Sequence, residues 1–335
     1  MTVLLVAAAS IFGLFVLALV AAFTLAASPS PPMPPPRDVF DFTSLRNNPT
    51  DVDMPGLRRY PARDGEELAY RIYDSTAERI LIFIHGSSYH GGGYHALASY
   101  LSRNGAAKVV LPNLRGHYQS GKRRGDVAYI GQLEDDLIDL IRFLRAEHVA
   151  GPMTLGGHSS GGGLAIRFAG GRHAEAGVSG YLLLAPVIPR APSVRGGTAG
   201  GWANLNLRRL FGLLALNAIG IHGFDALPVI AFNKPAKFWD GTETLSYSYR
   251  LNVSYHPRNS YQNDIRALGE RTLVLVGAND EAIDPDALRT VIAADAPRAQ
   301  ITILLGVNHF GIFSDPAALK AVAGWLCSLP LGAGP

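Results

Sequence analysis

The stretch MTLGGHSSGGG, from Met153 to Gly163, decides how the rest of the chain is interpreted. Its first five residues predict a short buried strand, and the segment from Gly161 to Phe168 predicts the start of a helix. The turn between them carries Gly-His-Ser-Ser-Gly, a match to G-x-S-x-G. Between a strand and a helix, this motif pushes one serine out of a sharp turn, and the flanking glycines let the turn close. Ser159 is therefore the predicted nucleophile.

A serine hydroxyl is a poor nucleophile unless a base takes its proton and an acid orients that base. In an open α/β sheet, such partners lie beyond the carboxyl ends of later strands. The stretch LVLVGANDEAID places Asp280 just after a predicted strand, with Glu281 and Asp284 as nearby competitors that spacing alone does not exclude. His309 follows the last predicted strand, in ILLGVNHFGIF. The chain order serine, aspartate, histidine predicts a triad of Ser159, Asp280 and His309.

A second glycine-rich stretch, FIHGSSYHGGGYH, holds three histidines spaced five residues apart, His85, His90 and His95. A metal site would need these side chains to converge, but no cysteine or carboxylate stands near them, and the spacing suits no single regular element. We therefore expect no metal here and a structural role for His85. A loop directly after a buried strand instead predicts a backbone donor, the Ser87 N–H, which would form an oxyanion hole with the Ser160 N–H.

Strands and helices alternate along most of the chain. Short β-branched runs predict buried strands, and 3.6-residue periodicity predicts the helices between them. Strands are predicted at 67–74, 79–86, 107–114, 153–157, 180–188, 271–277 and 299–306, and helices at 95–104, 132–148, after 161 and after 314. This alternation predicts a mostly parallel sheet with helices on both faces. Residues 189–264 are too long for an ordinary connection and predict a cap inserted over one end of the sheet.

The N-terminus has a different composition, with no charged side chain from Thr2 to Ala27. A membrane-spanning helix needs about 20 apolar residues, whereas a secretory signal has a shorter apolar core and a basic start. We therefore predict a single-pass membrane anchor at 1–27, with cleavage near LAAS as the alternative. A proline-rich linker at 28–39 and a soluble domain at 40–330, which includes the inserted cap, follow. The flanking charges do not fix the orientation, and the domain is expected on the extracytoplasmic side.

Composition limits the remaining function classes. The 335 residues are 48% apolar and 17% charged, which is ample material for a large core. The formal net charge is only +3 and the basic residues are scattered, so we expect no nucleic-acid partner. The single cysteine, Cys327, lies in the last helical pattern and is expected to be a buried apolar side chain.

Together these motifs resemble the α/β-hydrolases of the monoacylglycerol lipase, lysophospholipase and serine aminopeptidase group. The resemblance rests on RDGEELAYRIY, ILIFIHG, LPNLRGHYQSG, GGHSSGGG, LVGANDEAID and GVNHFGI, and covers the chain from Arg58 onward apart from the cap. Two positions depart from the family's D-x-R-G-H-G-x-S segment: Asn113 stands where aspartate is usual, and Tyr118 where glycine is usual. That segment normally braces the site, so a structural role is expected for Arg115.

The resemblance implies an α/β-hydrolase fold in which Ser159 is the nucleophile, His309 the base and Asp280 the acid, with no cofactor. It implies a serine hydrolase that cleaves carboxylic esters, lipid-like ones of the monoacylglycerol or lysophospholipid type. Amide or peptide hydrolysis and acyl transfer on the same triad are alternatives, because fold and triad do not separate them. A catalytically silent, membrane-anchored binding protein is an alternative of another class. The expected partners are a lipid ester and the membrane.

Overall fold

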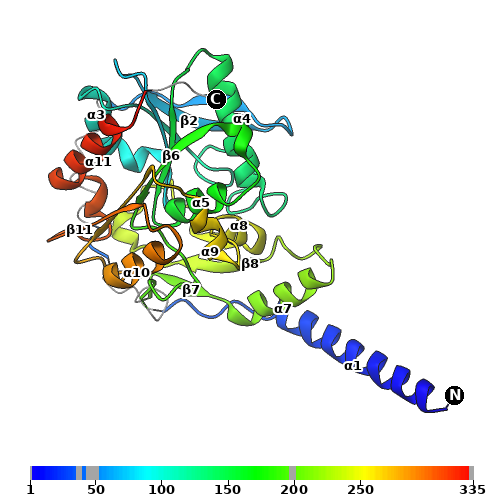
Figure 1. Cartoon of the computed structure of the whole chain (residues 1–335). Coiled ribbons are helices and arrows are strands. Elements are labelled where there is room, and N and C mark those ends of the chain that lie inside the picture. The colour runs from blue at the N-terminus through cyan, green and yellow to red at the C-terminus, as the bar shows by residue number, and fades with distance from the viewer. Residues whose placement is uncertain (1, 35–39, 43–52, 196–200, 332–335) are drawn as a thin grey trace.

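The computed structural model describes residues 2–34, 40–42, 53–195 and 201–331. Within these residues, an eight-stranded sheet in the order β1-β2-β4-β3-β5-β6-β10-β11 forms the centre of the molecule (Figure 1). Its strands are β1 (Arg58–Pro61), β2 (Glu67–Tyr73), β3 (Ile80–Ile84), β4 (Lys108–Pro112), β5 (Met153–His158), β6 (Val178–Leu184), β10 (Thr272–Gly277) and β11 (Gln300–Leu304). From β4 to β11 every pair is parallel, whereas β2 pairs antiparallel with both β1 and β4. The predicted mostly parallel sheet is confirmed.

The central strands β3, β5 and β10 are buried at every residue, as expected for strands covered on both faces. The surrounding helices are α3 (His95–Arg103), α4 (Gln132–Ala146), α5 (Ser160–Ala169), α9 (Tyr261–Arg266), α10 (Pro285–Asp295) and α11 (Pro316–Ser328). Short 3-10 turns are η2 (Gly91–Tyr94), η3 (Ala174–Ala176), η4 (Ala236–Phe238) and η5 (Gly311–Phe313). Among them, α3 contacts α11, and α9 contacts both α5 and α10. Because the strands from β4 to β11 are parallel, their carboxyl ends meet at one edge of the sheet.

Several local features differ from the expectations. The strand predicted to reach Ile188 ends at Leu184, because Ala185 adopts a φ of 45° and the next residue is a proline without an N–H. Strand β1 and helix α10 were not predicted. Cys327 was expected to be buried and is exposed, since the buried stripe of α11 runs through Leu319, Val322 and Leu326 and leaves the next position on the outer face.

The segment between β6 and β10 contains a second, smaller sheet. Its antiparallel strands are β7 (Ala203–Leu205), β8 (Pro228–Phe232) and β9 (Ser246–Ser248), joined with helices α7 (Leu207–Ala218) and α8 (Tyr249–Ser254). We call this segment the cap. It lies beside α5, and a pocket between the cap and the central sheet reaches Ser159.

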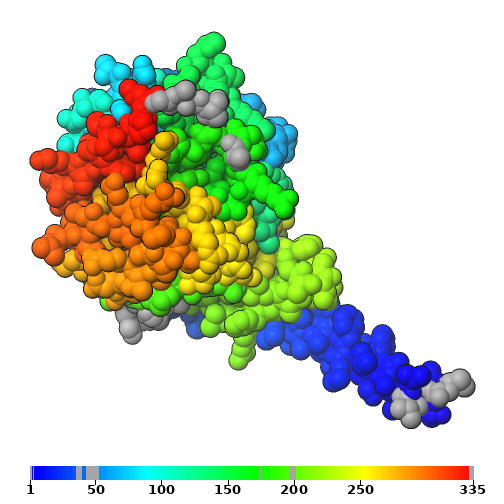
Figure 2. All heavy atoms as spheres, in the orientation of Figure 1, coloured from blue at the N-terminus to red at the C-terminus, as the bar shows by residue number. Residues whose placement is uncertain are grey.

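Helix α1 (Thr2–Ala26) is long and apolar enough to cross a membrane, by length and composition. It projects away from the rest of the molecule and meets it beside α7 of the cap (Figures 1 and 2). Residues 28–34 then run along the cap, where the side-chain amides of Asn204 and Asn233 donate to the carbonyls of Pro32 and Pro34. The remainder of the predicted linker, 35–39, lies outside the described residues.

Candidate active site

The turn that carries Ser159 is the one that G-x-S-x-G predicts. Strand β5 ends at His158, α5 begins at Ser160, and Ser159 between them has φ 54° and ψ −122°, a sparsely populated conformation for a residue with a side chain. A Cβ added at Gly157 would lie 2.3 Å from the backbone of Gly161, and one added at Gly161 would lie 2.3 Å from the Ile84 carbonyl oxygen. Both glycines are therefore sterically required for this turn.

Three side chains from three loops meet at the turn. The Ser159 hydroxyl lies 3.1 Å from His309 Nε2, and His309 Nδ1 lies 2.8 Å from Asp280 Oδ2. Asp280 and His309 are buried. The second carboxylate oxygen of Asp280 accepts the backbone N–H groups of Ala282 and Ile283, at 2.9 and 2.7 Å. This holds the carboxylate in place and orients the imidazole with its Nδ1–H toward the acid and its Nε2 toward the serine.

The two competing carboxylates have other partners. Asp284 caps α10, where its side chain accepts the N–H of Ala287 at 2.9 Å. Glu281 accepts the backbone N–H of His309 at 2.9 Å, so it holds the histidine loop and does not contact the imidazole nitrogens. Of the three candidates that spacing left open, Asp280 is therefore the one that reaches the ring.

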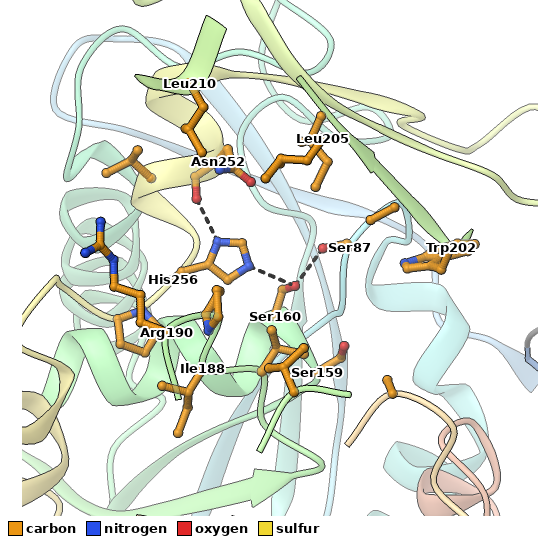
Figure 3. A pocket seen from close by; sticks show the side chains of 18 of the residues that line it. Ser87, Ser159, Ser160, Ile188, Arg190, Trp202, Leu205, Leu210, Asn252 and His256 are labelled. Carbon is orange, nitrogen blue, oxygen red and sulfur yellow. Dashed lines mark hydrogen bonds between the residues drawn. The ribbon is translucent and has the colours of Figure 1, made fainter. Parts of the chain in front are cut away.

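Ser87 and Ser160, whose N–H groups were predicted to form the oxyanion hole, lie together beside Ser159 (Figure 3). Their hydroxyls are 2.6 Å apart, which links the loop after β3 to the start of α5. Because α5 begins at Ser160, its backbone N–H belongs to the first turn, where amides have no acceptor within the helix. The loop after β3 and the start of α5 thus both place a residue next to Ser159.

A buried chain of hydrogen bonds supports these loops from below. The Gly86 N–H donates to the Tyr94 hydroxyl at 2.8 Å, and that hydroxyl lies 2.9 Å from His158 Nδ1. His158 Nε2 lies 2.9 Å from the His309 carbonyl oxygen, which can only accept, so the proton of the neutral ring is on Nε2. Burial lowers the pKa of His158 well below its usual value, consistent with a neutral ring. Sequence reasoning missed Tyr94 and His158 because their contacts are not local.

His85 has structural contacts, as predicted from the sequence. It is fully buried, its Nε2 accepts the N–H of Leu114 at 3.1 Å, and the Tyr255 hydroxyl donates to its backbone carbonyl at 2.6 Å. His90 caps η2, and His95 pairs with the Tyr73 hydroxyl at 2.9 Å. The three histidines therefore have separate partners. Across the described ranges, no group of three His, Cys, Asp or Glu side chains could hold a metal ion.

Arg115 also has the expected structural contacts. Its guanidinium forms a two-pronged pair with Asp136, at 2.9 and 2.8 Å, and contacts Asp64 and Glu66. At the two positions that depart from the family pattern, Asn113 accepts the Gly91 N–H and donates to the Tyr118 carbonyl, both at 2.8 Å. Asparagine thus bridges η2 and the 114–121 loop.

A pocket of about 650 Å³ opens over Ser159, between the cap and the sheet (Figure 3). This volume is within the range of small-molecule sites. Most of its wall is apolar and comes from the cap, with Leu205, Leu207, Leu210, Phe211, Leu214, Ile230 and Phe232. Polar groups include Ser160, whose hydroxyl lies 3.4 Å from His256 Nε2 beside the nucleophile turn, and His256 Nδ1–H, which donates to the Asn252 carbonyl at 2.8 Å. Arg190, Arg258 and Asn259 also line the pocket. The pocket therefore suits an extended apolar group with a polar end at Ser159.

Aromatic side chains from three distant segments cover the histidine. Phe40 stacks on the His309 ring with centroids 5.1 Å apart, and packs edge-on against Trp202 of the cap at 5.4 Å. Phe42 contacts Trp202 and Phe310 at 5.7 and 5.3 Å. Nothing in the local pattern around residues 40–42 signalled this role. These rings exclude water from the buried side of the His309–Asp280 pair.

Comparisons with known proteins agree with this architecture. Residues 75–222 match the family model described as serine aminopeptidase, S33. In structure, the chain is similar to a soluble variant of the monoglyceride lipase of Saccharomyces cerevisiae, with a TM-score of 0.64 and 19% identity over 84% of this chain and 97% of that one. The chain has the α/β-hydrolase fold and is similar to monoacylglycerol lipases. Both the predicted resemblance and the predicted fold class are confirmed.

Sequence relatives of this α/β-hydrolase point to the same group. A monoacylglycerol lipase of Mycolicibacterium smegmatis is 30% identical over 128 residues, 37% of this chain and 44% of that protein. The monoglyceride lipase of Rattus norvegicus is 30% identical over 154 residues, 45% of this chain and 50% of that protein. The chain thus spans about half the length of the curated relatives it matches.

Proposed function

We propose that this protein is a serine hydrolase that cleaves carboxylic esters through an acyl-enzyme. The observation that carries the proposal is the hydrogen-bonded chain Ser159–His309–Asp280, with distances of 3.1 and 2.8 Å, at the floor of an apolar pocket. A serine, a base that reaches it and an acid that orients the base are the parts that this chemistry requires.

In the proposed reaction, His309 Nε2 takes the proton of the Ser159 hydroxyl as its oxygen attacks the ester carbonyl. The N–H groups of Ser87 and Ser160 donate to the developing oxyanion, an interaction worth on the order of 3–4 kcal/mol per donor. Asp280 stabilises the imidazolium that forms. His309 then protonates the leaving alcohol, and a water activated by the same nitrogen hydrolyses the acyl-enzyme.

The pocket and the relatives support a lipid-like substrate of the monoacylglycerol or lysophospholipid type. The cap wall offers aliphatic and aromatic side chains along most of a 650 Å³ space, which suits an acyl chain. The similar proteins named as monoacylglycerol and monoglyceride lipases point in the same direction. The length and composition of helix α1 support a further part of the proposal, that the protein is anchored in a membrane. We also propose that its domain lies on the extracytoplasmic side.

Fluorophosphonate labelling of the full-length protein in detergent tests the nucleophile. We expect label on Ser159 in the wild type, none on Ser159→Ala, and retained label on Ser160→Ala, the matched control one residue away. Folded wild type that neither reacts with the probe nor hydrolyses a small activated ester would overturn the proposal in favour of a silent binding protein.

The substrate class is tested separately, by comparing turnover of glycerol esters and lysophospholipids of increasing chain length with that of aminoacyl amides. We expect turnover to rise with chain length and amides to be poor substrates. Faster cleavage of the amides, or preferential transfer of the acyl group to an added alcohol, would replace ester hydrolysis with one of the other chemistries of the same triad.

A further inference from the structure

Helix α1 approaches cap helix α7 at backbone-contact distance. A Cβ added at Gly212 of α7 would lie 2.3 Å from the Ala26 nitrogen and 2.6 Å from the Ala22 carbonyl oxygen. Ala22 and Ala26 are buried, whereas most of α1 before them is exposed. Small residues on both helices allow this close approach, as they do where helices pack inside membranes. Around the contact, the cap residues Leu213, Leu216, Val229 and Tyr249 form a separate apolar cluster with the two alanines.

Hydrogen bonds from Arg209 and Asn206 of the cap hold the end of α1 in this position. The buried guanidinium of Arg209 donates to the carbonyls of Ala26, Ser28 and Pro228, with the first and last at 3.2 and 2.7 Å. Asn206 accepts from the Ser28 hydroxyl at 3.2 Å and donates to the Pro29 carbonyl at 3.0 Å. A cation at the last carbonyls of a helix is favoured by the helix dipole. The segment LAAS, Leu25 to Ser28, where a signal peptide would be cleaved, is thus hydrogen-bonded to the cap.

The length of α1 determines how deep this contact lies in a membrane. The helix has 25 residues, about 37 Å at 1.5 Å per residue, and a bilayer core is about 30 Å thick. The contact with the cap involves Leu19, Ala22 and Ala26. The residues before it, 2–18, provide only about 25 Å. This is too short to span the core, so a membrane-spanning α1 requires the first turn of the docked part to enter the core as well, which brings α7 to the membrane surface.

The outer face of α7 is apolar, as expected for a helix at a membrane surface. Leu207 and Phe211 are 54% and 59% exposed, although both also line the pocket. Beyond the helix, Ile219 and Phe224 are exposed as well, and the Phe224 ring packs edge-on against Phe23 of α1 at 5.5 Å. The apolar surface of α1 therefore continues onto the cap and reaches the rim of the pocket. Contiguous apolar surface of this kind marks an interaction site.

We propose that α1 and α7 form one bilayer-docking unit, which seats the Leu207–Phe211 rim of the pocket in the headgroup region of the membrane. The partner is the lipid surface itself. An amphiphile would then pass from the bilayer into the pocket without crossing water, a consequence that rests on the proposed function. The docking itself does not depend on catalysis.

The test uses the full chain in phosphatidylcholine vesicles, with Cys327→Ser to remove the exposed thiol. An environment-sensitive fluorophore is placed at Phe211→Cys and, as the control, at Leu305→Cys, which is 88% exposed after β11 on the other side of the molecule from α7. We expect a blue-shifted emission and strong quenching by lipid-borne quenchers at position 211 only. Equal, water-like emission at both positions would overturn the proposal, as would recovery of a mature protein cleaved at LAAS.

Arg209→Ala and its neighbour Arg208→Ala form a matched pair, because only Arg209 is buried against α1. We expect Arg209→Ala to weaken lipid quenching at position 211 severalfold and Arg208→Ala to leave it unchanged. Gly212→Leu, which forces the helices apart, should act like Arg209→Ala if the latter folds poorly. Fluorophosphonate labelling of the same samples separates the two proposals. Label without quenching refutes the docking unit alone, and quenching without label refutes the hydrolase alone.

Discussion

Replacing Tyr94 by phenylalanine tests whether the buried hydrogen-bond chain supports the site. The hydroxyl accepts the Gly86 N–H at 2.8 Å and contacts His158 Nδ1 at 2.9 Å, and the tyrosine and histidine are buried. Phenylalanine keeps the ring but leaves two buried atoms, the Gly86 nitrogen and His158 Nδ1, without their hydrogen-bond partner, whereas His158 Nε2 keeps its bond to the His309 carbonyl. Each unsatisfied buried group costs about 1–3 kcal/mol, so the free energy of unfolding should fall by about 2–6 kcal/mol.

Thermal unfolding and ester turnover measure the effect. The midpoint should fall by about 2–4 °C for each kcal/mol lost. Turnover at a permissive temperature should fall as well, because Gly86 precedes Ser87 and His158 holds the His309 carbonyl. Tyr100→Phe is the control, since the Tyr100 hydroxyl has no hydrogen-bond partner among the described residues. An unchanged midpoint together with wild-type turnover in Tyr94→Phe would refute this account of the support.

Three further predictions follow from the site and its surroundings. Asp280→Asn should lower kcat on the order of 10³–10⁴-fold because the imidazole loses its orienting charge. Asp284→Asn still caps α10 and should leave ester hydrolysis near wild type. Equal losses of kcat in the two variants would argue against Asp280 as the acid. Gly161→Ala should abolish soluble folded protein because its Cβ would lie 2.3 Å from the Ile84 carbonyl oxygen. Gly324→Ala, which has open space around it, should raise the midpoint of thermal unfolding slightly. A Gly161→Ala protein that unfolds cooperatively in calorimetry and is active would contradict the steric argument. Burial lowers the pKa of His117 and His256 to about 4, below the unfolded value of about 6.5. The unfolded chain therefore binds more protons, and the free energy of unfolding should fall as pH drops from 6.5 toward 4, with a slope approaching about 1.4 kcal/mol per pH unit for each ring. His256→Gln should reduce this slope, and a midpoint of thermal unfolding that stays constant from pH 7.5 to 5 would rule the effect out.

Much of the architecture could be predicted because its causes are local. The run LVLV of β10 is apolar on both faces, which is typical of a strand covered on both sides, and a Cβ at Gly157 would lie 2.3 Å from Gly161 within the same turn. The N-cap of the last helix at Asp315, followed by Pro316, follows the same kind of short-range rule. Such features depend on residues a few positions apart, so a pattern in the chain reports them directly.

The sequence by itself therefore determined the strand–helix alternation, the turn that exposes Ser159, and the topological slots of Asp280 and His309. Only the tertiary structure decided that Asp280 and not Asp284 reaches the imidazole, that Phe40 covers it, and that Arg209 clasps the end of α1 across 183 positions of chain. These contacts join segments that no periodicity relates. Their partners are selected by where the folded sheet and cap bring them together, and that depends on the packing of the whole chain.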